Sequence, residues 1–304
     1  MQHEPLFSVV IPTHNRAGLI LKTLNSVLSQ TYRDYEVVVV DDASSDDTEQ
    51  VLAPLIENQS IRYFKHEQNC ERAQSRNTGM RHARGTFVAF LDSDDVMYPN
   101  NLQDAASFIS ANPTTKLFQN LYELVDDNGR VLCKYDFPSL ADPLYAITGG
   151  NFLASIGVFI HRDIFQNYSF DTSPLLTGSE DWDYWLRVVP DYTPGRINKV
   201  NNGVVQHGDR STVHLELDRL EQRFKYLTAK IRGDAKLSSV YAKYLNRLEA
   251  GALLYTSTVA NLTCHHSDAL RLLRRAASLD PGMVGSRSFI KALGIALLRW
   301  NKGY

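Results

Sequence analysis

The sequence has little cysteine, and its cysteines lack the spacing of a metal site. The 304 residues include three cysteines, Cys70, Cys133 and Cys264, which are far apart. Widely separated cysteines form neither a zinc motif nor a disulfide framework, so we interpret them as packed thiols in a reducing compartment. An excess of one charge is also lacking, because the formal net charge is −2. We therefore expect no nucleic-acid partner.

Long hydrophobic runs are missing as well. A membrane-spanning helix needs about 18 apolar residues in succession, and no stretch of the sequence reaches that length. The first residues, MQHEPLFSVVIP, have neither the basic segment nor the apolar core of a signal peptide. We therefore expect a cytoplasmic protein, and peripheral attachment to the inner face of the plasma membrane remains an open alternative.

The first third of the sequence alternates between strand patterns and helix patterns. The strand patterns cover residues 7–13, 35–44, 61–68 and 86–95, and the helix patterns cover residues 16–30, 44–56 and 73–85. We expect Ser45 or Asp46 to cap the second helix and Gly85 to end the third. Strands that alternate with helices predict a mostly parallel, doubly wound α/β sheet.

Beyond this region the pattern changes twice. Residues 116–137 resemble a hairpin with its turn at Asp127-Asn128-Gly129, and further strand-like segments follow at 157–165 and 195–208. From about residue 214 the apolar spacing is helical. We therefore expect a domain at residues 1–211 and a C-terminal helical region at residues 212–304.

Polar side chains follow three of the predicted strands. These are Thr13-His14-Asn15-Arg16, Asp41-Asp42 and Asp92-Ser93-Asp94-Asp95. Ligands of doubly wound sheets bind beyond the carboxyl ends of the strands, so we expect the three segments to meet at one edge.

Their chemistry suits a metal and a nucleotide. Asp92 and Asp94 could bind a hard divalent cation, although aspartates that cap a turn are the alternative. Asp42 or Asp41 could accept a hydrogen bond from a ribose hydroxyl or a base N–H, or could cap the next helix. Arg76, four residues after Arg72, suits a phosphate or carboxylate, and a solvated basic helix face is the alternative.

Two later segments offer further candidates. Glu180 and Asp181 lie beside Trp182 and Trp185, where burial would raise the pKa of a carboxyl group acting as a general base. An acidic first turn of a helix, with the tryptophans in the core, is the alternative. His207 follows a strand pattern and could be either a metal ligand or a packed histidine.

Together these segments resemble the inverting glycosyltransferases of family 2. The resemblance rests on the order and spacing of residues 7–48, the motif NTGMRHARGTFVAFLDSDD and the motif SEDWDYWLRV, and it covers roughly residues 6–210. It implies a GT-A fold, which is Rossmann-like with a mostly parallel central sheet, followed by a C-terminal helical extension.

The resemblance also implies a role for each matched residue. Asp181 would be the catalytic base, and Asp94, Asp92 and His207 would bind Mn²⁺ or Mg²⁺. The nucleotide sugar would be bound by residues from all of these segments: Pro12, Thr13, Asn15, Arg16, Asp41, Asp42, Arg76, Asp92, Ser93, Asp95 and Glu180. Glu71 departs from the pattern, because many relatives have glycine there.

The implied activity is the transfer of one sugar, with inversion, from a nucleoside diphosphate sugar to a glycan or lipid-linked glycan. UDP-sugars are the favoured donors, and the setting would be bacterial surface polysaccharide or glycoconjugate synthesis. The Gln-x-x-Arg-Trp motif of processive synthases is absent after Trp185. A nucleotidyltransferase and a catalytically silent sugar-nucleotide-binding module are the alternatives.

The C-terminal helices have three open interpretations. They could shape the acceptor side, form a homodimer contact or, through residues 284–304, lie on a membrane surface. This last segment is basic and apolar, and it contains no Asp or Glu.

Overall fold

The computed structural model describes residues 4–207 and 216–300, and it forms two compact units. The first unit comprises Met1–Phe137, Leu153–Thr172 and Asp191–Arg210, and the second comprises Pro138–Phe152, Ser173–Pro190 and Ser211–Tyr304. The boundary that we expected at residues 211 and 212 lies outside the described residues. The expected first domain includes two segments, Pro138–Phe152 and Ser173–Pro190, that cluster with the helical unit.

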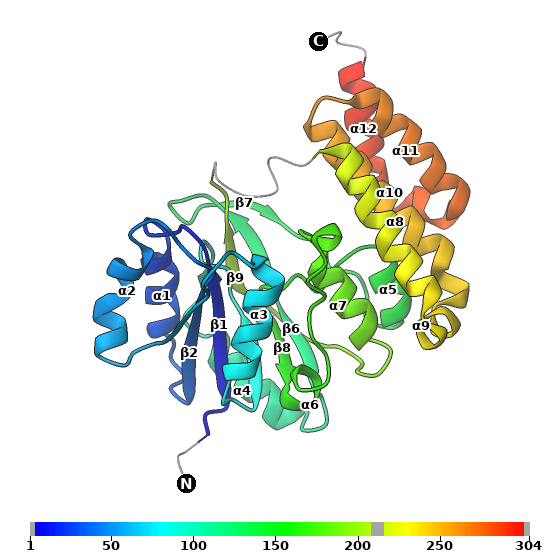
Figure 1. Cartoon of the computed structure of the whole chain (residues 1–304). Helices are drawn as coiled ribbons and strands as arrows, with labels where there is room; N and C mark the ends of the chain where they lie inside the picture. Colours follow the sequence, from blue (N-terminus) through cyan, green and yellow to red (C-terminus); the bar gives the residue numbers. More distant parts are fainter. Residues whose placement is uncertain (1–3, 208–215, 301–304) are drawn as a thin grey trace. The chain divides into compact units, whose positions relative to one another are not determined.

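The first unit is built on a mixed sheet in which the expected parallel strands lie together (Figure 1). The strand order is β3-β2-β1-β4-β8-β6-β9-β5, with β7 paired to β6. The strands are β1 (Phe7–Thr13), β2 (Tyr35–Asp41), β3 (Arg62–Lys65), β4 (Phe87–Phe90), β5 (Val96–Met97), β6 (Leu117–Val125), β7 (Val131–Lys134), β8 (Val158–His161) and β9 (Gly195–Val205). The pairs β3-β2, β2-β1, β1-β4 and β6-β9 are parallel, and the sheet becomes antiparallel at β8. The α/β fold class predicted from the sequence is confirmed.

Helices cover both faces of this sheet, which explains its continuous apolar strands. The helices are α1 (Ile20–Leu28), α2 (Thr48–Glu57), α3 (Glu71–His82), α4 (Asn101–Ala111) and α6 (Arg162–Phe165). Val9 and Ile11 of β1 belong to one core together with side chains of α1 and α4. Val10, which points to the opposite face, lies against Gly79 of α3. Each residue of β1 is therefore buried.

Three details of the helices differ from the sequence prediction. Helix α1 begins at Ile20 and not at residue 16, because residues 14–19 form a loop in which Asn15 has φ +51°. The N-cap of α2 is Asp47, although the Asp46 carboxylate does accept the N–H of Thr48 at 3.1 Å. Helix α3 ends before Gly85, whose absent side chain instead allows close contact with β1, since a Cβ would lie 2.5 Å from the Ser8 nitrogen.

A closed ring of three buried asparagines joins α4, β6 and β9. Asn101 donates to Asn202 at 2.7 Å, Asn202 donates to Asn120 at 2.6 Å, and Asn120 donates to Asn101 at 3.0 Å. All three are inaccessible to solvent. Gly157, with φ +78°, packs against the ring, where a Cβ would lie 2.5 Å from the Asn120 Oδ1. We call this arrangement the asparagine ring.

The second unit is helical. Its elements are α5 (Pro143–Thr148), η1 (Pro174–Leu176), α7 (Glu180–Val188), α8 (Leu217–Gly233), α9 (Ala235–Val240), η3 (Ala242–Tyr244), α10 (Leu245–Leu262), α11 (His266–Leu279), η4 (Pro281–Gly285) and α12 (Arg287–Trp300). The helices α10, α11 and α12 share an apolar core that includes Leu254, Leu273 and Phe289. Among the described residues, no helix combines the length and hydropathy that crossing a bilayer requires.

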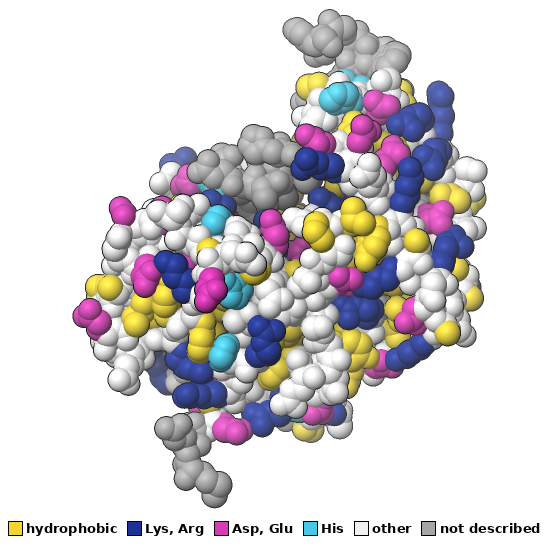
Figure 2. Space-filling view, in the orientation of Figure 1, with side chains coloured by type: hydrophobic (Ala, Val, Ile, Leu, Met, Phe, Trp, Pro, Cys, Tyr) yellow, Lys and Arg dark blue, Asp and Glu magenta, His cyan; other side chains and the backbone are white. Residues whose placement is uncertain are grey.

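Helix α12 has different residues on its two sides. Phe289, Ala292 and Ala296 are buried, whereas Ile290, Leu297 and Leu298 are 58%, 48% and 72% exposed. Arg287 and Lys291 are exposed as well. On the face of the molecule drawn in Figure 2, Lys and Arg side chains are interspersed with Asp and Glu.

Candidate active site

The polar loops after β1, β2 and β4 meet at one edge of the sheet in the first unit. The Asp42 N–H donates to the Thr13 carbonyl at 2.8 Å, and the Asn15 N–H donates to the Ser44 hydroxyl at 2.9 Å. The Arg16 N–H donates to Thr48 Oγ1 at 3.1 Å. These contacts fix the loop after β1 against the loop after β2. The prediction that strand ends would bring these segments together therefore agrees with the geometry.

Asp41 and Asp42 are both buried, but their carboxylates have different partners. Asp41 Oδ2 accepts from the Tyr63 hydroxyl at 2.6 Å, and Oδ1 accepts from the Ser44 N–H at 2.8 Å. Burial and the adjacent Asp41 raise the pKa of Tyr63, which keeps it a hydrogen-bond donor. Both oxygens of Asp41 are thus used to hold the loop. A nucleotide contact by Asp41 stays a prediction.

Asp42 has partners at only one of its oxygens. Oδ1 lies 2.7 Å from His66 Nδ1 and accepts from the Cys70 N–H at 2.9 Å. Within residues 4–207 and 216–300, the structure places no donor at Oδ2. Pro12 and Thr13, at the end of β1, lie beside this loop, and Thr13 Oγ1 is buried with no hydrogen-bond partner among the described residues.

The Asp94 carboxylate lies close to the guanidinium of Arg16 and the imidazole of His207. Its Oδ2 lies 3.0 Å from His207 Nε2 and 3.7 Å from Arg16 Nη2. All three side chains are mostly buried, with exposed fractions of 12%, 9% and 24% for Asp94, His207 and Arg16. The sequence matched His207 loosely, yet the structure brings it to Asp94 from 113 positions away.

Asp92 pairs with the second arginine of this edge. Arg76 Nη2 lies 3.0 Å from Asp92 Oδ1, and the Arg76 side chain is 3% exposed. Its guanidinium lies 5.6 Å from the centroid of Phe170, which is held by two hydrogen bonds with the Asn77 side chain. Stacking on an aromatic ring keeps a buried guanidinium in one orientation. Arg76 is therefore positioned at the site and does not belong to a solvated basic face.

Asp95 and Ser93 are buried within the same loop. The Asp95 carboxylate accepts the Val205 N–H at 2.9 Å, and the Asp95 carbonyl accepts from the Thr23 hydroxyl at 2.8 Å. Asp95 is 1% exposed and Ser93 is 6% exposed. These contacts show that Asp95 joins the loop after β4 to β9 and α1, while its contact with a donor sugar stays a prediction.

The residues around Asp94 suit a divalent cation. Two neighbouring ligands of an octahedral ion with bonds of about 2.1 Å lie about 3 Å apart, which matches the distance from Asp94 Oδ2 to His207 Nε2. His207 Nδ1 is buried without a hydrogen-bond partner among the described residues. A carboxylate and an imidazole together suit Mn²⁺.

A different group of side chains forms a compact set of three candidate metal ligands. One ligand atom each from Asp42, His66 and Cys70 lies within 4.8 Å of the other two. A set with a thiol and an imidazole suits zinc better than Mg²⁺ or Mn²⁺. The Asp42 and His66 atoms share a hydrogen bond at 2.7 Å, and the Asp94 and His207 atoms share one at 3.0 Å, so both groups form hydrogen bonds in the structure.

Glu180 and Asp181 begin helix α7 in the second unit, which we describe by itself. Glu180 Oε2 accepts the Gly178 N–H at 2.6 Å, and Asp181 Oδ1 accepts the Trp182 N–H at 2.8 Å. The Trp182 side chain donates to the Ile147 carbonyl at 2.8 Å. Asp181 therefore lies in the first turn of a well-anchored helix.

The third acid of this helix has a structural environment. Asp183 is inaccessible to solvent and is paired with Arg187 at 2.9 Å and Lys230 at 2.7 Å. A carboxylate with two cationic partners in a buried site is held in place. Among the three acids that the sequence places around the tryptophans, Asp183 thus stabilises the unit itself.

Sequence reasoning did not identify His66, Tyr63 or Phe170 as parts of the site. His66 comes directly after Lys65, the last residue of β3, so the rule that strand ends bear ligands could have found it. Phe170 lies in a segment without a regular pattern. Only its hydrogen bonds to Asn77 and its position beside Arg76 reveal it.

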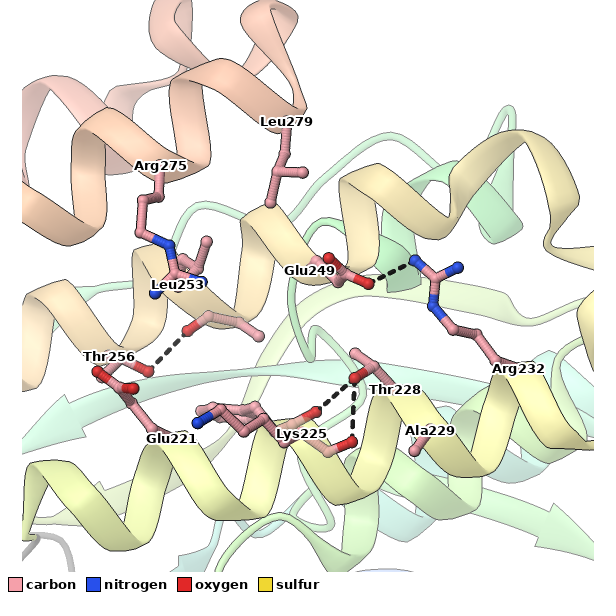
Figure 3. Close-up of a pocket in the computed structure, with 12 residues that line it drawn as sticks. Glu221, Lys225, Thr228, Ala229, Arg232, Glu249, Leu253, Thr256, Arg275 and Leu279 are labelled. Atoms are coloured by element: carbon pink, nitrogen blue, oxygen red, sulfur yellow. Dashed lines mark hydrogen bonds and ion pairs between the residues drawn. The ribbon is translucent and has the colours of Figure 1, made fainter.

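The second unit also contains a groove, drawn in Figure 3. It has a volume of about 270 Å³ and lies between α8, α10 and α11. Its lining includes Phe224, Leu253 and Leu279, and an ion pair joins Arg232 of α8 to Glu249 of α10. Hence an apolar groove with charged edges lies in the helical unit.

A Rossmann-like sheet with a buried carboxylate, two positioned arginines and an Asp-His pair at its carboxyl edge is typical of nucleotide-binding α/β enzymes. Comparisons agree with this class. Residues 8–145 match the family model described as "Glycosyl transferase family 2". The Escherichia coli protein "UDP-Glc:alpha-D-GlcNAc-diphosphoundecaprenol beta-1,3-glucosyltransferase WfgD" is 30% identical over 198 residues, which cover 64% of this chain and 73% of that relative. The chain therefore belongs to glycosyl transferase family 2.

Another relative is longer than this chain. An "Uncharacterized glycosyltransferase" of Rickettsia bellii is 27% identical over 243 residues, which cover 79% of this chain but 34% of the relative. The chain thus spans about a third of the length of that relative.

Solved structures support the GT-A fold. S. aureus TarS 1–349 has a TM-score of 0.66 and 19% identity, with 97% of this chain and 88% of that chain covered. The mannosyltransferase PcManGT from Pyrobaculum calidifontis, solved with GDP-Man and Mn²⁺, has a TM-score of 0.62 and 19% identity, with 99% and 89% covered. At such identities the likeness shows the fold alone.

Proposed function

We propose that this chain transfers one sugar, with inversion, from a UDP-sugar to a hydroxyl group of a lipid-linked glycan. The observation that carries the proposal is the convergence of Asp94, His207 and Arg16 at the sheet edge where Arg76 and Asp42 also lie. The name of the Escherichia coli relative supports this donor and acceptor class. Synthesis of a bacterial surface polysaccharide or glycoconjugate would use such a reaction.

The residues divide the task as follows. Asp42 accepts an N–H from the base, and Arg16 and Arg76 orient and neutralise the diphosphate. Asp94 and His207, with Asp92 beside them, would hold Mn²⁺ or Mg²⁺, which when bound would stabilise charge on the leaving diphosphate. The PcManGT structure was solved with Mn²⁺, which supports a metal of this kind.

We assign the proton transfer to Asp181. Its carboxylate accepts the proton of the acceptor hydroxyl as that oxygen attacks the anomeric carbon, and a single displacement inverts the configuration. Glu180, whose carboxylate is held by the Gly178 N–H, orients the start of the same helix. The assignment of Asp181 rests on the family motif and on its anchored position in α7.

The test compares Asp181→Asn with wild type and with Asp127→Asn, which changes an exposed hairpin aspartate. UDP-glucose and GlcNAc-diphosphoundecaprenol are the first donor and acceptor to assay, with Mn²⁺ present. We expect Asp181→Asn to lower turnover by at least about 100-fold, because general-base catalysis contributes this much, and to keep UDP affinity unchanged. Asp127→Asn should behave as wild type. Wild-type turnover in Asp181→Asn would refute the base assignment.

We also propose that the outer side of α12 lies on a membrane surface. The exposed Ile290, Leu297 and Leu298 would enter the lipid boundary, while Arg287 and Lys291 would contact anionic headgroups. A homodimer contact through the same side is the competing proposal. Residues 301–304 of the segment that we predicted to do this lie outside the described residues.

A further inference from the structure

The Asp42 carboxylate is prepared to bind a ligand through one oxygen. Asp42 is 4% exposed, and its Oδ1 is already occupied by His66 Nδ1 at 2.7 Å and by the Cys70 N–H at 2.9 Å. In the described part of the chain, no donor lies at Oδ2. A carboxylate oxygen without a protein donor can accept an N–H or O–H from a ligand.

His66 is itself held from its other side. Its Nε2 lies 2.9 Å from Thr78 Oγ1, and Arg81 Nη2 donates to the same hydroxyl at 2.7 Å. Since Arg81 can only donate, the hydroxyl proton of Thr78 is available to His66 Nε2, and His66 can donate from Nδ1 to Asp42. The chain Arg81–Thr78–His66–Asp42 thus orients the carboxylate and keeps Oδ1 occupied.

We propose that His66 is a specificity-determining residue that makes Asp42 a single acceptor and thereby favours uracil over guanine as the donor base. The inference rests on the proposed function. Uracil offers one imide N–H between two carbonyl groups, which a single carboxylate oxygen satisfies. Guanine offers two N–H groups side by side, which require both oxygens of a carboxylate.

Guanine at Asp42 would therefore either leave one donor unpaired or displace His66. An unpaired buried donor costs its full desolvation energy, so a site that cannot satisfy it discriminates strongly. The fold alone does not decide between the bases, because TarS was solved with UDP and PcManGT with GDP-Man. In this chain, the two donors at Asp42 Oδ1 favour uracil over guanine.

The test measures the affinities of UDP and GDP by isothermal titration calorimetry with Mn²⁺ on the full chain. The variants are His66→Leu, which removes the donor to Oδ1, and Thr78→Val, which removes the hydroxyl that holds His66. His82→Leu is the matched control, because His82 lies in α3 but stacks on Phe64, with ring centroids 3.8 Å apart, and has no hydrogen bond to Asp42.

We expect wild type to bind UDP about tenfold or more tightly than GDP, since one lost hydrogen bond to a carboxylate is worth about that factor. His66→Leu should reduce the UDP-to-GDP ratio severalfold, Thr78→Val should reduce it less, and His82→Leu should leave it unchanged. Equal weakening of both nucleotides in His66→Leu would show a purely structural role and would overturn the inference. Equal wild-type affinities, or no binding of either nucleotide, would overturn it too. Absence of sugar transfer together with intact selectivity for UDP would instead contradict the proposed function and support the inference.

Discussion

Asp94 and Asp95 are neighbours in the chain, but their carboxylates have different surroundings. Asp94 faces His207 and Arg16, whereas Asp95 accepts the buried N–H of Val205. The sequence motif presents both as equivalent acids after a strand. In the structure, one carboxylate is available to a cation and the other connects two elements of the first unit.

We expect the alanine variant of Asp94 to affect ligand binding and the alanine variant of Asp95 to affect stability. Asp94→Ala should abolish the part of UDP affinity that depends on Mn²⁺, with only a small change in stability. Asp95→Ala should lower the free energy of unfolding by about 1–3 kcal/mol, because it removes the buried carboxylate that accepts the Val205 N–H. Calorimetric titration with Mn²⁺ or EDTA and urea denaturation measure the two effects. Mn²⁺-dependent binding that survives in Asp94→Ala would contradict the metal assignment.

Helix α3 packs directly on strand β1. It lies on β1 so closely that a Cβ on Gly79 would be 2.2 Å from Val10 Cγ1. Val10 is a stiff, β-branched residue in a central strand and cannot move away easily. The close packing brings Arg76 and Thr78 of the same helix to the carboxyl edge of the sheet.

Gly79→Ala should therefore destabilise the protein by about 1–3 kcal/mol, as overpacking of a core does. Gly18→Ala is the control, because a Cβ there would meet no atom within 4 Å. Thermal denaturation of both variants measures the difference. A Gly79→Ala protein as stable as Gly18→Ala would mean that α3 can move away from β1.

The short helix α6 predicts a dependence of stability on pH. Its N-cap residue His161 accepts the Asp163 N–H at Nδ1 over 3.2 Å, which requires a neutral ring. Burial lowers the pKa of His161, with further lowering by Lys116 and Arg162 and an opposing effect of Asp163. The unfolded chain therefore binds the proton at higher pH than the folded chain does.

The His161 contribution to stability should accordingly be complete above its ordinary pKa of about 6.5 and should decrease as the pH falls below that value. His161→Asn keeps a capping acceptor but cannot titrate in this range, so its unfolding free energy should fall less between pH 7 and pH 5. Urea denaturation across that range measures the slopes. Parallel profiles for wild type and His161→Asn would refute this origin of the pH dependence.

The sequence predicts the parallel strands of the first unit better than it predicts the roles of the residues in the candidate active site. The parallel strands β1 to β4 were predictable because burial on both faces requires continuous apolar runs, and their polar ends indicated the site. The sequence could not show which of Asp41, Asp42 and Asp95 have carboxylates that hold the loops, because this depends on donors that are distant in the chain, such as Tyr63 and Val205. Backbone conformations at Asn15 and Glu71, with φ +51° and +68°, likewise depend on tertiary contacts that favour a left-handed residue.

The whole molecule can be tested for membrane contact. Replacing both Leu297 and Leu298 by Ser removes exposed apolar surface from α12 and leaves its buried side intact. We expect wild type to float with vesicles that contain anionic lipid, more weakly with neutral vesicles, and the double variant to remain unbound. Leu21→Ser, at an exposed leucine of the first unit, is the control. Unchanged flotation of the double variant would contradict the proposal, and loss of a dimer in size-exclusion chromatography would favour the alternative interface.

The asparagine ring limits which amino-acid substitutions this protein tolerates at three positions. Each of its three amides donates one hydrogen bond and accepts one around a closed circuit, so the direction of every bond determines the direction of the other two. Replacement of any one asparagine leaves two orphaned polar groups in a space inaccessible to water. Replacement of all three by apolar residues of similar volume leaves none. The effects of substitutions at the three positions on the free energy of unfolding should therefore not be additive. The second and third substitutions should restore stability that the first one removes.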